Sequence, residues 1–216
     1  MLQLYSFWRS SASYRVRIAL SLKGLPYEYR PVHLVKDGGE QNKPEYHALN
    51  PQGRVPLLVD GDFKLGQSMA ILDYLEAKAP HPPLVPKDAK ARARMLSFCN
   101  VIVADIQPLQ NTGPLKMLGE SLGATEDQRF AWIRHWIERG LGALEHERTS
   151  TPDTPYVFGD SPTWADCVLV PQVYNADRHG ADPSKFPRLY ALAQRLKALS
   201  AFAAAAPDRQ PDYPKP

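Results

Sequence analysis

The stretch Phe-Trp-Arg-Ser-Ser-Ala-Ser-Tyr-Arg-Val-Arg-Ile-Ala-Leu, residues 7–20, decides how the fold of this chain is interpreted. Residues 2–8 alternate apolar and polar side chains, which predicts a strand, and the stretch continues into an apolar helical pattern. Ser10, Ser11 and Ser13 lie at the turn between the two. A serine hydroxyl caps a helix N-terminus well, and the partial positive charge there favours an anion. The turn therefore predicts either an ordinary helix cap or a site that stabilises a thiolate.

The composition is typical of a globular protein with one large or two small domains. The chain has 216 residues, 44% of them hydrophobic, and a net charge of only +3 from scattered basic residues. We therefore expect a proper core and neither a nucleic-acid nor a membrane surface. Cys99 and Cys167 lie far apart in apolar surroundings, which predicts buried thiols and no metal site. The absence of a signal-like or long apolar segment predicts a cytoplasmic protein.

The first eighty residues show strand and helix patterns in turn. A second strand is expected within 25–32, and the polar stretch 35–50 predicts a loop with a short helix. The dipeptide Asp60-Gly61 stands between two apolar runs, which predicts a β-hairpin. The pair Gln67-Ser68 opens a helical pattern that continues to residue 78. The order of elements is therefore β-α-β followed by β-β-α.

The rest of the chain shows helical spacing only. Four helical segments are expected, at 88–118, 126–147, 163–179 and 187–202. Residues 163–166, Thr-Trp-Ala-Asp, form a capping box, in which the threonine and the acid three positions later satisfy helix-start N–H groups. We expect an α/β domain at 1–79, a proline-rich linker at 80–87 and an all-α domain at 88–216.

Four motifs, spread over nearly the whole chain, resemble the zeta class of glutathione transferases. They are the serine turn with its helix at 10–20, Asp-Ile-Gln-Pro-Leu-Gln-Asn at 105–111, the segment 170–178 with Val-Pro-Gln-Val and Asn-Ala-Asp-Arg, and Arg-Gln-Pro-Asp at 209–212. The resemblance implies a thioredoxin-like N-terminal domain, an all-helical C-terminal domain and a homodimer. The zeta class includes maleylacetoacetate isomerase and maleylpyruvate isomerase.

The resemblance also implies that glutathione is the cofactor and which residues hold it. Ser10 would point its hydroxyl at the glutathione sulfur, and Ser11 would add a donor nearby. The backbone of Val55, which precedes an expected cis-proline, would pair with the cysteine amide of glutathione. Gln67 and Ser68 would hold its γ-glutamyl end at a helix N-terminus. The alternatives are ordinary helix caps and a rigid turn.

Three amides are further candidates for contacts with glutathione. Gln41, in the polar loop, would hold the glycyl end, and its alternative is a solvated loop residue. Gln107 and Asn111 lie one helical turn apart, so we expect them to share a face of one helix and to reach the ligand from the second domain. Their alternative is a buried structural amide pair.

Two arginines are candidates for a second substrate with carboxylate groups. Arginine binds carboxylates with two parallel hydrogen bonds, and the resemblance assigns this role to Arg9 and Arg178. Their alternatives are a surface charge for Arg9 and a helix-end salt bridge for Arg178. Arg15 and Arg17 fall inside the first helix and are interpreted as structural. Ala12 occupies a position that is often cysteine in the family, so this turn has no thiol. Any chemistry assigned to a residue at that position must therefore belong to glutathione itself or to Ser10.

The activity implied by the resemblance is glutathione-dependent cis–trans isomerisation of a maleyl compound to its fumaryl isomer, without consumption of glutathione. Maleylacetoacetate, an intermediate of tyrosine and phenylalanine breakdown, is the expected substrate. The alternatives are isomerisation of maleylpyruvate and general glutathione transfer. A non-catalytic interaction protein with the same fold is the alternative of another class. The candidate residues Ser10, Gln67, Ser68 and Arg178 argue against it, because a scaffold does not need them.

Overall fold

The computed structural model describes residues 1–149 and 153–214, and its contacts divide the chain into two compact units. The first unit consists of Met1–Leu84 together with Lys197–Pro216, and the second unit is Val85–Leu196. Each unit has its own buried core. The candidate residues of the serine turn therefore lie in the unit that also contains the last segment of the chain.

These units differ from the predicted domains at the end of the chain. The predicted boundaries were 1–79 for the α/β domain and 88–216 for the helical domain, whereas Lys197–Pro216 belongs with the first unit. Residues 150–152 and 215–216, which the predicted helical domain includes, lie outside the described residues. The difference arises because the last segment makes its hydrogen bonds to residues near the N-terminus, which local sequence patterns do not reveal.

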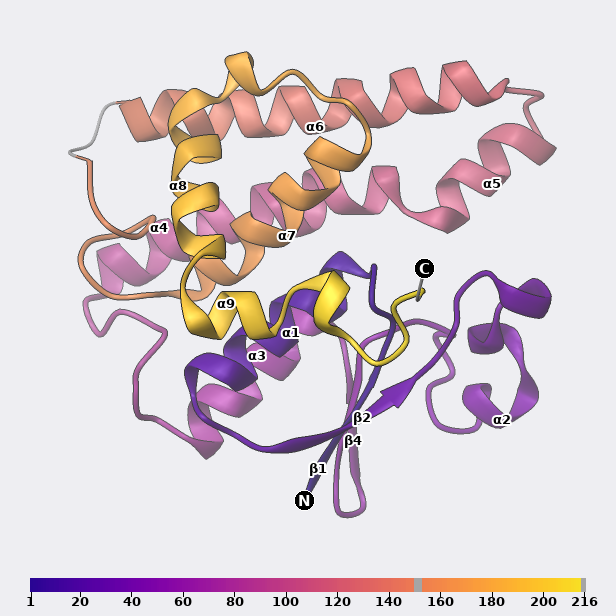
Figure 1. The fold of residues 1–216 in the computed structure, drawn as a ribbon, viewed down its shortest axis with the longest axis horizontal. Coiled ribbons are helices and arrows are strands. Elements are labelled where there is room, and N and C mark those ends of the chain that lie inside the picture. The colour runs from indigo at the N-terminus through magenta and orange to yellow at the C-terminus, as the bar shows by residue number, and fades with distance from the viewer. Residues whose placement is uncertain (150–152, 215–216) are drawn as a thin grey trace. The chain divides into compact units, whose positions relative to one another are not determined.

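The first unit is built on a four-stranded mixed sheet (Figure 1). Its strands are β1 (Leu2–Ser6), β2 (Tyr27–Pro31), β3 (Leu57–Asp60) and β4 (Phe63–Gly66), in the order β2-β1-β3-β4. Strand β1 pairs in parallel with β2 and antiparallel with β3, and β3 pairs antiparallel with β4. The hairpin predicted at Asp60-Gly61 is confirmed, and Gly61 has the positive φ of 60° that such a turn favours.

Helices α1 (Ser11–Leu22) and α3 (Ser68–Lys78) pack their apolar faces into the core of this unit. The polar stretch after β2 contains two short 3-10 helices and one short α-helix: η1 (Lys36–Gly38), η2 (Glu40–Asn42) and α2 (Pro44–His47). Near the C-terminus, α9 (Ser200–Ala204) lies beside α1 and is followed by η6 (Pro207–Arg209) (Figure 1). The predicted order of strands and helices in residues 1–78 is confirmed.

The described residues of the second unit form helices and their connections, without a strand. Its main helices are α4 (Ala89–Asn100), α5 (Thr112–Glu120), α6 (Glu126–Thr149), α7 (Trp164–Arg178) and α8 (Pro187–Lys197), and the short helix η5 (Pro183–Lys185) precedes α8. The helix expected over 88–118 is not continuous, because a π-helical turn η3 (Val101–Ile106) and a 3-10 turn η4 (Gln107–Gln110) separate α4 from α5. Here α6 comes so close that a Cβ on Gly140 would lie 2.3 Å from the Ile106 side chain.

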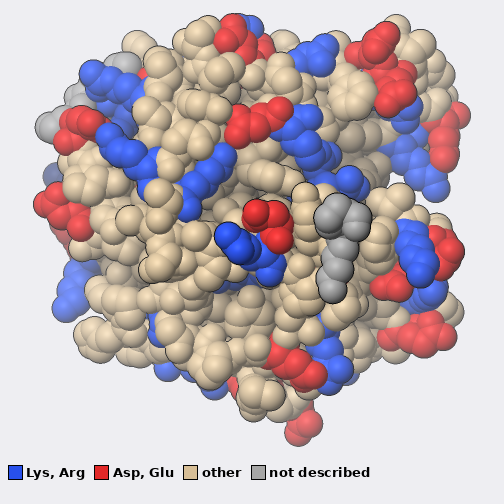
Figure 2. Space-filling model, in the orientation of Figure 1, with Lys and Arg blue, Asp and Glu red and all other residues tan. Residues whose placement is uncertain are grey.

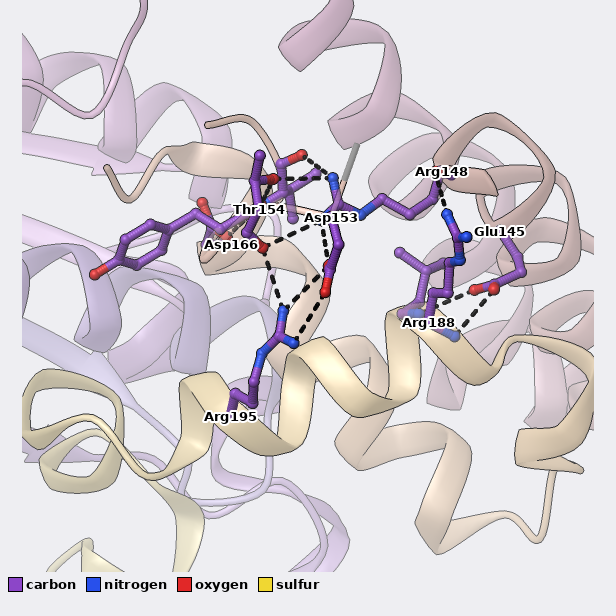
Figure 3. Close-up of polar contacts among 10 residues, drawn as sticks. Glu145, Arg148, Asp153, Thr154, Asp166, Arg188 and Arg195 are labelled. Carbon is purple, nitrogen blue, oxygen red and sulfur yellow. Dashed lines mark hydrogen bonds and ion pairs between the residues drawn. The ribbon is translucent and has the colours of Figure 1, made fainter. Parts of the chain in front are cut away.

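A buried carboxylate organises the start of α7. Asp166 accepts hydrogen bonds from the backbone N–H of Thr163 at 2.7 Å and of Val157 at 2.8 Å. The capping box predicted at 163–166 is therefore confirmed. Arg148, near the end of α6, donates to the Val157 carbonyl and to the Thr154 hydroxyl. The two side chains together hold Thr154 and Val157, which precede α7 (Figure 3).

Carboxylates from α6 and from the following connection also hold α8. Glu145 accepts the backbone N–H groups of Arg188 and Leu189 at 3.0 and 2.9 Å, so it caps the first turn of α8. Asp153 faces the guanidinium group of Arg195, with N–O distances of 3.4 Å (Figure 3). The helices of this unit are thus joined by polar contacts at their ends as well as by the apolar core.

The surface gives no single charged face in the view of Figure 2, where Lys and Arg are interspersed with Asp and Glu. Within residues 1–149 and 153–214, no helix combines the length and the hydropathy needed to cross a bilayer. The same residues contain no group of three or more His, Cys, Asp or Glu side chains suited to hold a metal ion. Cys99 and Cys167 are buried, as the sequence predicts.

Asp166→Asn removes the titrating group of the capping box. Burial raises the pKa of Asp166 from 3.8 to about 6, so the folded state binds its proton more tightly than the unfolded state does. The stability that this shift contributes is complete below about pH 4 and is lost as the pH rises through about 6. We therefore expect the free energy of unfolding of the wild type, relative to Asp166→Asn, to fall by about 2 kcal/mol between about pH 4 and pH 7. Urea unfolding of both proteins at each pH measures this difference, and a difference independent of pH would contradict the prediction.

Candidate active site

The serine turn connects β1 to α1. Ser10 is the N-cap of α1, with extended backbone angles, and its Oγ accepts the N–H of Ser13 at 3.2 Å. Ser11 is the first helical residue and is buried. Ser10 therefore caps α1, and this role is compatible with a second role toward a ligand. Capping uses only an acceptor lone pair of the hydroxyl, so the hydroxyl hydrogen of Ser10 remains available for donation to a ligand.

A second helix N-terminus in the same unit carries Gln67 and Ser68. Gln67 precedes α3 with a φ of 65°, which is rare for a residue other than glycine, and no side chain caps this helix start. Ser68 is buried, and its Oγ accepts a hydrogen bond from Nη1 of Arg15 at 3.2 Å. A helix start with uncapped N–H groups beside a guanidinium group is suited to bind a carboxylate.

Arg15, which the sequence interpretation takes as structural, lies beside the candidate residue Ser68. The pattern of α1 indicates only a structural role, because Ser68 lies 53 positions further along the chain. Both side chains are buried, so their contact links the start of α3 to the middle of α1. An arginine on the apolar face of a helix is the one available signal, since a buried charge requires partners.

Gln41 lies in η2, on the loop that follows β2. Its Nε2 donates to the Leu34 carbonyl at 3.2 Å, whereas its buried Oε1 has no hydrogen-bond partner in the protein. A buried acceptor of this kind is expected to bind a donor, such as the amide N–H of a peptide-like ligand. Gly39 permits this arrangement, because a Cβ at that position would lie 2.4 Å from Nε2 of Gln41.

The bond between Val55 and Pro56 is cis, as expected. Val55 is buried in a small apolar cluster with Phe7 at the end of β1. The residue before it is held in place because the Arg54 carbonyl accepts hydrogen bonds from the hydroxyl of Tyr46 and from the amide of Asn50, both at 2.7 Å. The backbone of Val55 is therefore fixed between the loop and the serine turn.

The expectation that Gln107 and Asn111 share one helix face is wrong. Gln107 opens η4, whereas Asn111 has extended backbone angles and caps α5 by accepting the N–H of Thr112 at 2.8 Å. The helix is interrupted between them, so they are not one regular turn apart. The buried amide pair in this region consists instead of Gln110 and Gln172, which donate to each other at 2.9 and 3.3 Å.

The two candidate arginines differ in their surroundings. The guanidinium group of Arg9 is half-buried and lies 5.6 Å from the ring centre of Phe7 and 5.5 Å from that of Trp8. Such cation–π contacts hold the cation in place without neutralising its charge. Arg178 is the exposed last residue of α7, with its Nη2 3.0 Å from Nε2 of His179.

The candidate residues are divided between the two units. Those in the first unit are Arg9, Ser10, Ser11, Gln41, Val55, Gln67 and Ser68, and those in the second are Gln107, Asn111 and Arg178. Two helix N-termini, of α1 and α3, thus lie in one unit and are linked through Arg15. This unit offers a hydroxyl donor at one helix start and a carboxylate site at the other.

Known proteins match this chain over nearly its whole length. Two family models match, "Glutathione S-transferase, N-terminal domain" at residues 4–83 and "Glutathione S-transferase, C-terminal domain" at residues 131–205. The maleylacetoacetate isomerase of Pseudomonas aeruginosa is 46% identical over 214 residues, which are 99% of this chain and 99% of that protein.

Solved structures agree with these matches. A holo structure of maleyl pyruvate isomerase, described as a bacterial glutathione S-transferase in the zeta class, has a TM-score of 0.95 at 44% identity and covers 98% of this chain and 100% of its own. A maleylacetoacetate isomerase from Anaeromyxobacter dehalogenans 2CP-1, with glutathione bound in its active site, has a TM-score of 0.87 at 44% identity and covers 99% and 98%.

The fold is therefore that of a glutathione S-transferase, and the predicted combination of an α/β N-terminal part with an all-helical C-terminal part is confirmed. The serine turn and the cis-proline loop both fall within the matched N-terminal domain. The chain belongs to the glutathione S-transferase family, and within it to the group of zeta-class transferases and maleylacetoacetate isomerases.

Two substitutions at Ser10 separate its capping role from any other role. Ser10→Ala removes the acceptor for the Ser13 N–H, so we expect the free energy of unfolding to fall by about 1 kcal/mol. Ser10→Asn keeps a good capping side chain, so its stability is expected to stay within about 0.5 kcal/mol of the wild type. Chemical denaturation measures both values. Equal losses in the two variants would show that the cap does not stabilise α1.

Proposed function

We propose that this protein is a glutathione-dependent isomerase that converts maleylacetoacetate to fumarylacetoacetate in tyrosine and phenylalanine breakdown. The observation that carries the proposal is the pair of helix N-termini in the first unit. One presents the Ser10 hydroxyl, and the other presents uncapped N–H groups beside the contact of Arg15 with Ser68. The high identity to a maleylacetoacetate isomerase over the full length supports the substrate class.

The residues of the first unit fit glutathione. The start of α3, with Gln67 and Ser68, suits the γ-glutamyl carboxylate, since it combines a helix N-terminus with a guanidinium group. The orphan Oε1 of Gln41 suits the amide N–H at the glycyl end. The backbone of Val55 is assigned to the cysteine amide, and the hydroxyl of Ser10 to the sulfur. The fit thus involves each part of the tripeptide.

The remaining candidates complete the proposed site. Ser11 adds a donor beside Ser10 at the start of α1, and Gln107 and Asn111 contribute contacts from the second unit. Arg9 and Arg178 bind the carboxylates of the substrate. The position that is often cysteine in the family is Ala12, so this chain supplies no thiol of its own at the turn.

Glutathione, when bound, would supply the thiolate nucleophile for reversible addition to the cis double bond. The residues of the chain make this possible in three ways. Ser10 donates its hydroxyl hydrogen toward the sulfur, and the start of α1 favours the negative charge there. Arg9 and Arg178 orient the substrate and stabilise the negative charge that develops on its oxygen atoms.

The size of each contribution to the rate shows which of these effects matters most. Lowering a thiol pKa of about 8.5 by about two units raises the thiolate fraction at neutral pH about 25-fold. The intrinsic nucleophilicity falls about 8-fold over the same shift, which leaves a net gain of about 3-fold. Orientation of the two reactants and the charges of the arginines must therefore provide most of the rate enhancement.

The nearest alternative is the isomerisation of maleylpyruvate, which is favoured by the close structural match to a maleyl pyruvate isomerase. The two substrates share the cis double bond and differ in the tail beyond the keto group. General glutathione transfer is the other catalytic alternative. A homodimer and a cytoplasmic location remain part of the proposal, as the family resemblance predicts.

Turnover of maleylacetoacetate and maleylpyruvate, each with and without glutathione, tests the proposed function. We expect a glutathione-dependent rate that is much faster on maleylacetoacetate.

In Ser10→Asn the rate is expected to fall about tenfold or more although α1 stays capped, because the hydroxyl donor is lost. A faster rate on maleylpyruvate would move the protein to that reaction. No rate on either substrate, in protein that binds glutathione, would reject isomerisation.

Arg178→Ala tests the assignment of the substrate carboxylate. Because Arg178 is assigned to the substrate and not to glutathione, we expect kcat/KM for isomerisation to fall about 100-fold, while the Kd of glutathione changes less than about 3-fold. Steady-state kinetics and calorimetric titration with glutathione give the two values. Equal losses in turnover and glutathione binding would contradict the assignment.

A further inference from the structure

A buried guanidinium group holds the serine turn from one side. Arg17, on α1, has only 1% of its surface exposed. Its Nη1 donates to the Phe7 carbonyl at 3.3 Å, its Nη2 donates to the Trp8 carbonyl at 3.0 Å, and its Nε donates to the Ala205 carbonyl at 3.0 Å. Nη1 also donates to the hydroxyl of Ser6 at 3.2 Å. Arg17 thus joins the end of β1 and the turn to the C-terminal segment.

A carboxylate from that C-terminal segment holds the turn from the other side. Asp212 accepts the backbone N–H of Trp8 at 3.0 Å through Oδ2 and the hydroxyl of Tyr29 at 2.6 Å through Oδ1. The ring of the next residue, Tyr213, meets the Trp8 ring edge-on, with the ring centres 4.9 Å apart. Gln210 fixes the segment by donating to the Ala206 carbonyl at 2.7 Å.

The peptide group between Phe7 and Trp8 therefore lies between two opposite charges. Its carbonyl faces the Arg17 cation and its N–H faces the Asp212 anion, which is the favourable orientation for a peptide dipole. The same carbonyl of Phe7 accepts the N–H of Ser10 at 3.0 Å. The position of Ser10 thus depends directly on a peptide group that both charges hold.

We propose that Asp212 is a positioning residue: together with Arg17 it fixes the Phe7–Trp8 peptide and thereby the turn that carries Arg9 and Ser10. The role of Asp212 in catalysis rests on the proposed function, because Arg9 and Ser10 act there on the substrate and on glutathione. The contacts of Asp212 are with the protein, and the residues assigned to the two ends of glutathione lie on other elements. Its loss is therefore expected to lower kcat while the affinity for glutathione is kept.

Amide hydrogen exchange in the ligand-free protein tests the structural half of this inference. We expect the Trp8 amide of Asp212→Ala to exchange about tenfold faster or more than in the wild type, because a hydrogen bond to a charged group is lost. The amides of Leu4 and Leu58, in the middle of the sheet, are expected to keep their rates. Asp208→Ala is the matched control, since Asp208 is an exposed acid in the same C-terminal segment.

Steady-state kinetics test the catalytic half. For Asp212→Ala we expect kcat to fall about tenfold or more and KM for glutathione to change less than about 3-fold, because a displaced turn misplaces reacting groups without removing the binding residues. Asp212→Asn keeps an oxygen acceptor without the charge, so its kcat is expected to lie between those of Asp212→Ala and the wild type. Asp208→Ala should match the wild type.

Each outcome separates the inference from the proposed function. Exchange that accelerates equally at Trp8, Leu4 and Leu58 would overturn the inference, since it indicates general destabilisation. An active wild type with unchanged kcat in both Asp212 variants would also overturn it and leave the function intact. An inactive wild type, with selectively faster Trp8 exchange in Asp212→Ala, would reject the proposed function. It would still support the inference that Asp212 fixes the peptide between Phe7 and Trp8.

Discussion

The interaction on which the first unit depends is the burial of the Arg17 guanidinium group. A charge removed from water is costly unless its donors find acceptors, and Arg17 finds them in the last strand residue, the serine turn and the C-terminal segment. The first two parts are adjacent in the sequence, whereas Ala205 in the C-terminal segment lies 188 positions from Arg17. Because one side chain joins them, the turn cannot move without disturbing the packing of α9 and α1. The position of Ser10 is thus set by the core beneath it.

Much of the fold could be predicted from the sequence because its signals are local. The hairpin at Asp60-Gly61, the helix starts at Ser10 and Gln67, and the capping box at 163–166 each depend on a few consecutive residues, and each is present. The family resemblance added the cis bond before Pro56, which no local pattern could have assigned. Residues of the candidate site that lie at helix starts were therefore the most readily predicted.

The remaining features depend on contacts between distant residues. Helical spacing placed Gln107 and Asn111 on one face, but the 3-10 turn from Gln107 to Gln110 and the extended backbone of Asn111 interrupt the helical register between them. The contact of Arg15 with Ser68 and that of Asp212 with Trp8 join residues 53 and 204 positions apart. In the sequence, Asp212 is only part of a family motif near the C-terminus. Its contact with the serine turn becomes visible only when the last segment of the chain is placed on the first unit.

In the proposed site, the fixed turn presents the Ser10 hydroxyl and the start of α1 to the sulfur of glutathione. The most direct test is a pH titration of the ultraviolet absorbance of the thiolate in the complex of the wild-type protein with glutathione. We expect a midpoint clearly below the value of about 8.5 for an unperturbed thiol, because the hydroxyl donor and the helix start both stabilise the thiolate. A midpoint at the value of free glutathione, in protein shown by calorimetry to bind it, would contradict the claim.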